Sequence, residues 1–186
     1  MQRSVVTGGE QMIGTPSESA LDDVEIVTLS ADDVPAMMAL IELTKPGPFG
    51  TFGPHHVTRE VILAFAAEFD PQPMHLDEAA ANASMLKGLS GSGWHLGSLM
   101  IRMLFDGFIG RTASLGSPGV NEMRWLSPLR PGDDLTLDVD VSEARVSKSR
   151  PDTGIVTFKG TVRNASGQVL CEMESPIIVR RRASAE

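Results

Sequence analysis

The chain has 186 residues, a hydrophobic fraction of 41%, a charged fraction of 22% and a formal net charge of −8. These values are typical of one globular domain with a tail, and the negative charge argues against nucleic acid and anionic membranes, which attract basic surfaces. Cys171 is the lone cysteine, so an intramolecular disulfide is impossible and a reducing compartment is expected.

The first 35 residues differ in composition from the rest. They combine Gly and Ser with many acidic side chains and have little hydrophobic periodicity, as mobile segments do. We predict an acidic, mobile N-terminal tail over residues 1–35 and one folded domain over residues 36–182. The acidic start does not resemble a signal or transit peptide, and no apolar run reaches the roughly 18 residues of a membrane span. We therefore expect a cytoplasmic protein.

Helical signals dominate the first half of the domain. After a Gly- and Pro-rich segment at Pro46–His56, Thr58 is a candidate cap for a helix that ends near Pro71. A short helix is predicted over Asp77–Ala83 with Asp77 as its cap. Apolar side chains then recur at helical spacing on nearly all sides between residues 96 and 108, which predicts a buried helix.

The second half changes to the alternating pattern of strands. Apolar and polar residues alternate over residues 135–141, 156–162 and 169–173, with turn sequences between them. Such alternation favours half-solvated antiparallel strands over a parallel sheet. Helices followed by a run of strands indicate the α+β class, with one buried helix packed against a long antiparallel sheet.

One string holds the residues with the clearest catalytic potential. Asp70 and His75 lie five positions apart across Pro71 and Pro73, which limit the conformations of the segment. A carboxylate and an imidazole at fixed separation suit proton transfer, such as the addition of water to a double bond. The alternative is structural, with Asp70 capping a helix and His75 buried as a packing residue.

Three strings together resemble the MaoC-like dehydratases and (R)-specific enoyl-CoA hydratases. Asp70 to His75 is similar to their Asp-x-Asn-Pro-x-His motif, Ser92 to Ser98 is similar to their entry into the long helix, and Glu122 to Asp134 is similar to a strand followed by a Pro-Gly-Asp turn. The resemblance covers about residues 52–179. The chain departs from the family at Gln72, where Asn is usual, and at Phe69, where Gly is common.

The resemblance implies a single hotdog domain, in which a curved antiparallel sheet wraps a long central helix. It implies that Asp70 and His75 hold and activate a water molecule, and that the N–H of Gly93 faces the thioester oxygen. Ser98 matches a serine that supports the catalytic pair. The alternatives are that Gly93 only punctuates a loop, and that Ser98 is a helix serine bonded to the preceding turn.

The implied reaction is the reversible hydration of a trans-2-enoyl-CoA to a (R)-3-hydroxyacyl-CoA, with no metal or redox cofactor. The implied assembly is a homodimer or a higher homo-oligomer, and neither nucleic acid nor membrane is an expected partner. Lys87, Arg124 and Arg130 are candidate contacts for the CoA phosphates. Two other functions stay open: a hotdog acyl-CoA thioesterase and a non-catalytic acyl-binding module.

Overall fold

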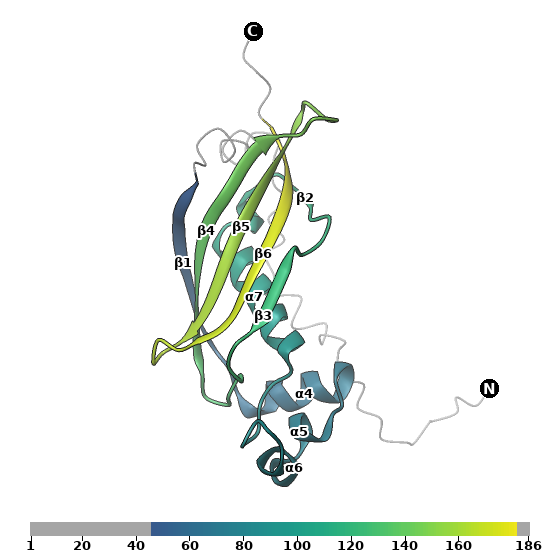
Figure 1. The fold of residues 1–186 in the computed structure, drawn as a ribbon, viewed down its shortest axis with the longest axis vertical. Coiled ribbons are helices and arrows are strands. Elements are labelled where there is room, and N and C mark those ends of the chain that lie inside the picture. Colours follow the sequence, from purple (N-terminus) through teal and green to yellow (C-terminus); the bar gives the residue numbers. More distant parts are fainter. Residues whose placement is uncertain (1–45, 182–186) are drawn as a thin grey trace, which may run out of the picture.

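A computed structural model describes residues 46–181. Both the tail predicted for residues 1–35 and the first ten residues of the predicted domain lie outside this range. The described chain forms one curved antiparallel sheet with the long helix α7 (Gly93–Gly107) behind it (Figure 1). This is the predicted α+β hotdog architecture.

The sheet has strand order β1-β4-β5-β6-β2 among the described residues, and β3 also pairs with β6. Three long strands form its centre, and β1, β2 and β3 lie at its two edges. The strands are β1 (Gly47–His56), β2 (Ser114–Gly116), β3 (Glu122–Trp125), β4 (Asp134–Val146), β5 (Thr153–Asn164) and β6 (Val169–Arg180).

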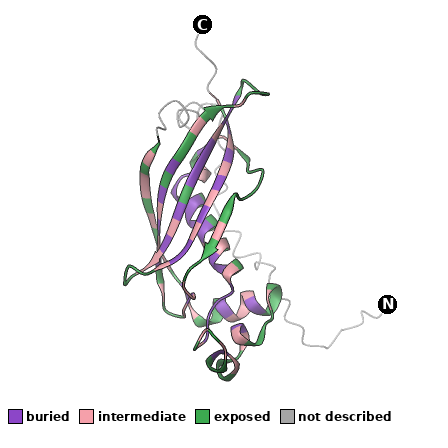
Figure 2. Cartoon of the chain, in the orientation of Figure 1, coloured by how far each residue is buried: buried purple, intermediate pink, exposed green. Residues whose placement is uncertain are grey.

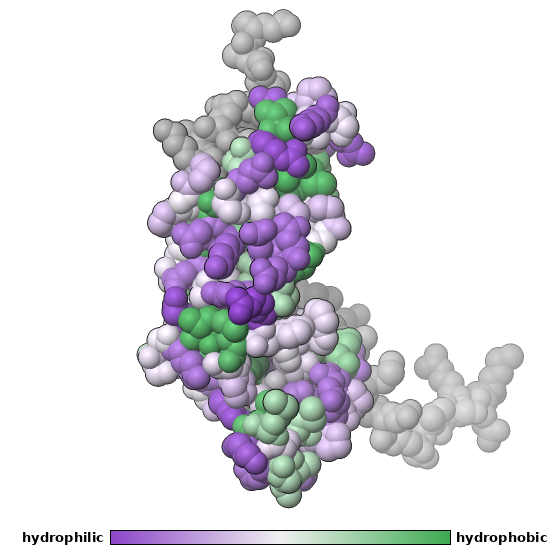
Figure 3. Space-filling model, viewed as in Figure 1, coloured by the Kyte–Doolittle hydropathy of each residue, from purple (hydrophilic) through white to green (hydrophobic). Residues whose placement is uncertain are grey.

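Alternation along the central strands separates the two faces of the sheet. In β4, Leu135, Leu137, Val139 and Val141 are buried, whereas the residues between them are more exposed. Figure 2 shows buried residues in the central strands and on the side of α7 that faces them. Figure 3 shows hydrophilic side chains gathered over the middle of the sheet's outer face. The inner face therefore packs on α7.

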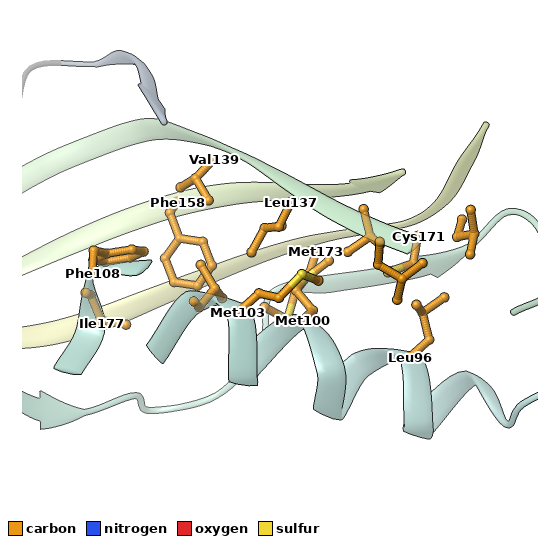
Figure 4. Close-up of a cluster of buried hydrophobic side chains, with 14 of the residues drawn as sticks. Leu96, Met100, Met103, Phe108, Leu137, Val139, Phe158, Cys171, Met173 and Ile177 are labelled. Carbon is orange, nitrogen blue, oxygen red and sulfur yellow. The ribbon is translucent and has the colours of Figure 1, made fainter. Parts of the chain in front are cut away.

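The core lies between α7 and this inner face. Leu96, Met100 and Met103 project from the helix toward Leu137 and Phe158 of the strands (Figure 4). Burial of one such side chain contributes about 1.5–3 kcal/mol to stability. Cys171 belongs to the same core, and burial raises the pKa of its thiol to about 12, so the thiol stays protonated.

Three short helices precede α7 and lie beside its N-terminal end (Figure 1). They are α4 (Arg59–Phe69), α5 (Pro73–Leu76) and α6 (Glu78–Ala83). The predicted caps are present, since Thr58 accepts from the Val61 N–H and Asp77 accepts from the Ala80 N–H. Both side chains satisfy N–H groups that have no partner within their helix.

Two elements of the structure were not predicted from the sequence. Most of the Gly- and Pro-rich segment Pro46–His56 forms strand β1, which pairs with β4 at the sheet edge through an irregular register. An edge strand tolerates Pro because one row of its N–H groups has no partner strand. Helix α5, which contains His75, was not predicted because it has four residues and begins with Pro73.

Helix α7 is also less buried than its sequence suggested. Its sheet-facing side is in the core, but Trp94, Ile101 and Phe105 are exposed in the described chain, with 64%, 47% and 54% of their surface accessible. These three residues lie on one side of the helix, because their spacings of seven and four residues are close to whole helical turns. We call them the outer stripe of α7. No helix in residues 46–181 is long and apolar enough to cross a bilayer.

Candidate active site

The catalytic candidates lie where α4, α5 and α7 meet. Asp70 is the C-cap of α4, and its N–H donates to the Ala66 carbonyl. His75 is in α5 and is 7% exposed. Pro73 occupies the first turn of α5, where the N–H that proline lacks would have no helical partner. Pro71 thus follows the end of α4 and Pro73 begins α5. The side chains of Asp70 and His75 lie on the same side of this junction.

Hydrogen bonds orient both members of this pair. His75 Nδ1 lies 2.7 Å from the Ser90 carbonyl oxygen, and because a carbonyl only accepts, Nδ1 carries the proton. In the neutral ring Nε2 is then free to accept a proton, and it lies 3.7 Å from Asp70 Oδ2. This distance exceeds a direct hydrogen bond, so one water molecule between the groups is in reach of both.

The Asp70 carboxylate accepts a hydrogen bond on each oxygen. Ser92 Oγ donates to Oδ2 at 2.6 Å, and Gln72 Nε2 donates to Oδ1 at 2.7 Å. The bond from Ser92, followed by that from Gln72, holds the pKa of Asp70 below its ordinary value, because both bonds favour the charged form. Gln72, which departs from the family motif, thus contacts the acid through its amide.

A pocket of about 360 Å³ opens beside His75. Its volume falls within the range of small-molecule sites, and its wall is mostly apolar. The lining residues are His75, Met85, Leu86, Ser90, Gly91, Ser92, Gly93, Leu96, Trp125, Leu126, Ser127, Pro128 and Leu129. An apolar group of a ligand bound in this pocket would therefore lie next to the imidazole of His75 and to the start of α7.

Gly93 is the first residue of α7 and lines this pocket. Within residues 46–181, its N–H has no hydrogen-bond acceptor, as is usual in the first turn of a helix. The ring of Trp125 covers Gly93: its Nε1–H donates to the Gly93 carbonyl at 2.8 Å, and a Cβ at residue 93 would lie 2.8 Å from the indole. Packing against Trp125 is thus one reason for glycine here, and sequence reasoning did not anticipate it.

The structure does not bring Ser98 to the pair within this chain. Its hydroxyl donates to the Trp94 carbonyl at 2.9 Å, and the residue is exposed on α7 and does not line the pocket. Ser92, one turn and a half earlier, contacts Asp70 instead. Sequence reasoning placed Ser92 in the helix-entry motif but gave it no role, because a contact across 22 positions leaves no local pattern.

The candidate phosphate contacts have different environments. Arg130 donates to the carbonyls of Gly88, Leu89 and Leu86, so its guanidinium is already used by the pocket wall. Arg124 is exposed, and its Nη1 lies 3.7 Å from Oε2 of Glu172. Lys87 is exposed, and its backbone has a φ of 54°. In the described part of the chain, no three His, Cys, Asp or Glu side chains come together as a metal site requires.

Comparison with known proteins places the chain in a family. Residues 46–164 match the family described as the MaoC like domain, and this range holds Asp70, His75 and Gly93. The chain belongs to the MaoC-like dehydratase family.

The chain is also similar to solved structures and to a curated protein. A MaoC-like dehydratase from Rhodospirillum rubrum has 38% identity and a TM-score of 0.69, covering 76% of this chain and 96% of its own. The (R)-hydratase PhaJ1 from Pseudomonas aeruginosa shares the fold with 22% identity and a TM-score of 0.61, covering 78% and 91%. YdeM of Bacillus subtilis, an uncharacterized protein, is 29% identical over 67% of this chain and 87% of its own.

His95 lies under the site and packs on α4. Its ring stacks on Phe65 with centroids 4.6 Å apart and planes 6° apart, and its Nδ1 is buried without a hydrogen-bond partner in the described structure. Burial, with a smaller contribution from the charge of His55, lowers the pKa of His95 from 6.5 to about 4. The folded protein therefore holds this ring neutral.

We predict that His95 makes stability fall on acidification. Between about pH 6.5 and pH 4 the unfolded chain protonates this histidine and the folded chain does not, so the free energy of unfolding decreases as pH falls through this window. His95→Phe keeps the stacking on Phe65 but removes the titration. Urea unfolding at pH 7 and pH 5 should show a smaller pH dependence for His95→Phe, and an unchanged dependence would contradict the prediction.

Proposed function

We propose that this protein is an acyl-CoA hydratase/dehydratase that reversibly adds water to a trans-2-enoyl-CoA to form a (R)-3-hydroxyacyl-CoA. The observation that carries the proposal is the pair of Asp70 and His75, with His75 Nε2 3.7 Å from the carboxylate and at the wall of an apolar pocket. Similar folds include an (R)-hydratase, which supports the stereochemistry. Cytoplasmic localisation stays a prediction.

In the proposed reaction a water molecule lies between Asp70 Oδ2 and His75 Nε2. The water oxygen bonds to C3 of the enoyl group while its proton passes to Nε2, and the electron pair of the double bond moves toward the thioester oxygen. Nε2–H then returns the proton to C2, so the net change is the addition of one water. The carboxylate of Asp70 stabilises the imidazolium that forms between the two steps.

The N–H of Gly93 is the proposed donor to the thioester oxygen. Negative charge develops on this oxygen in the enolate, and a fixed N–H at a helix start is suited to receive it. The hydroxyl of Ser92 links Asp70 to the same turn of α7, which fixes both groups relative to the pocket. The reaction needs neither a metal nor a redox cofactor, and CoA is part of the substrate.

We also propose a homodimer. A second copy would cover the outer stripe of α7 and the edges of β1 and β3 that have no partner strand within residues 46–181, and exposed strand edges in particular favour pairing. Two-fold dimers are also the commonest closed oligomers.

We predict that both members of the pair are needed for hydration. Asp70→Asn removes the negative charge with little change in shape, and His75→Ala removes the imidazole. Each should reduce kcat by about 10²–10⁴, the usual contribution of a positioned acid or base. Since the residues act as a unit, the double variant should be little worse than either single variant.

The measurement is the absorbance change of the conjugated thioester, with short, long and branched enoyl-CoAs as substrates. Release of free thiol, followed in the same samples, would instead indicate a thioesterase. If the wild type hydrates a substrate and a single variant hydrates it at the same rate, the residue changed in that variant has no catalytic role.

We predict that deletion of the Gly93 N–H reduces turnover by about 10²–10³. Gly93→Pro removes this N–H at the first helical position, where proline is tolerated, and the ψ of 146° at Ser92 suits the residue before a proline. Gly93→Ala is the control, because it adds a Cβ but keeps the N–H. Both changes are made together with Trp125→Ala, which removes the ring that the Cβ would meet.

The ratio of kcat between the Gly93→Ala and Gly93→Pro variants gives the contribution of the N–H of residue 93 to the rate. Equal rates for the two variants would show that Gly93 serves only the packing of Trp125. Melting temperatures of the same preparations separate loss of function from loss of fold.

We predict a dimer that depends on the outer stripe. Light scattering at micromolar concentration should give about twice the chain mass of 19.9 kDa. Phe105→Glu places a charge in the stripe and should shift the population toward the single chain, whereas Val146→Glu, an exposed position at the end of β4, should not. A 19.9 kDa species for the wild type would refute the dimer.

A further inference from the structure

Ser92 occupies the junction between the acid and the long helix. It is 1% exposed and is the N-cap of α7. Its hydroxyl donates to Asp70 Oδ2 at 2.6 Å and accepts from the Trp94 N–H at 3.2 Å. A serine hydroxyl has one proton, so this proton is committed to the carboxylate while a lone pair of the oxygen caps the helix. One atom thus joins Asp70 to the first turn of α7.

The hydrogen bond from Ser92 reaches the part of Asp70 that faces His75. Oδ2, which receives the Ser92 bond, is also the oxygen that faces His75 Nε2 at 3.7 Å. Gln72 holds the other oxygen from the α4–α5 connection, but it is exposed, whereas Ser92 is buried. In the described structure, His75 of α5 is the titratable group whose charge acts on Asp70, and α7 contributes only the neutral hydroxyl of Ser92.

We propose that Ser92 is a positioning residue, which holds Asp70 Oδ2 toward His75 and fixes the carboxylate to the turn of α7 that presents the Gly93 N–H. This inference rests on the proposed function. It goes beyond it because the family resemblance gives the supporting role to Ser98, whose hydroxyl bonds to the Trp94 carbonyl in this chain. A buried hydrogen bond to a charged group is stronger than a neutral one, so its loss has a measurable effect.

The first experiment needs no substrate. The carboxyl ¹³C resonance of Asp70 is followed by NMR through a pH titration of the wild type, Ser92→Ala and Ser92→Thr. Ser92 contributes the largest lowering of the pKa of Asp70, so Ser92→Ala should raise it, and Ser92→Thr, which keeps the hydroxyl, should restore it. Thr58→Ala is the control, because it removes the N-cap of α4 without touching the carboxylate.

The second experiment uses turnover of an enoyl-CoA. Ser92→Ala should lower kcat on the order of ten- to a hundred-fold with a small effect on KM, in line with the strength of a hydrogen bond to a charge. The reaction requires the carboxylate, and the variant protonates it at higher pH, so the acid limb of the rate profile should move to higher pH. Thr58→Ala should lower the melting temperature but leave this limb in place.

The outcomes separate the two proposals. If the wild type hydrates no enoyl-CoA but Ser92→Ala raises the pKa of Asp70, the proposed function fails and the hold of Ser92 on Asp70 stands. If Ser92→Ala leaves both the Asp70 titration and the acid limb where they are in the wild type, the role of Ser92 is overturned. Ser92→Cys, of similar volume and with a weaker donor, gives the same test if Ser92→Ala does not fold.

Discussion

The packing of α7 against the concave face of the sheet is the interaction on which the other features depend. Leu96, Met100 and Leu104 are almost fully buried against the strands, which fixes both the rotation of the helix and its position along its axis. The start of the helix is then fixed as well, and with it Ser92 and Gly93. The site is thus built where a rigid core element ends, and its remaining parts come from the short helices and the strand β3 that meet it there.

Much of the fold follows from local signals in the sequence. Period-two alternation predicts the central strands, and the caps Thr58 and Asp77 predict the starts of α4 and α6. Strand β1 was missed because pairing at a sheet edge overrides the poor strand propensity of Gly and Pro. Ile101 and Phe105 of the outer stripe were predicted to be buried, since apolar periodicity alone does not distinguish a buried helix face from an exposed one.

The candidate site divides in the same way. Asp70, His75 and Gly93 are predictable because their motifs are short and continuous in sequence, and the structure brings His75 and Gly93 to one pocket with Asp70 beside them. The residues that orient them are not predictable from such motifs, because Ser92 contacts Asp70 across 22 positions and Trp125 contacts Gly93 across 32. Such contacts follow from the tertiary fold alone, so sequence patterns identify the candidate reacting groups better than the residues that orient them.

Arg130 gives the pocket wall an unusual support. The segment from Leu86 to Leu89 has no helix or strand, and three of its carbonyls accept hydrogen bonds from this one guanidinium. Leu86 of this segment lines the pocket. The position of this part of the pocket wall therefore depends on a long, planar side chain at residue 130. Lysine there would keep the charge but lose the geometry that reaches three carbonyls at once.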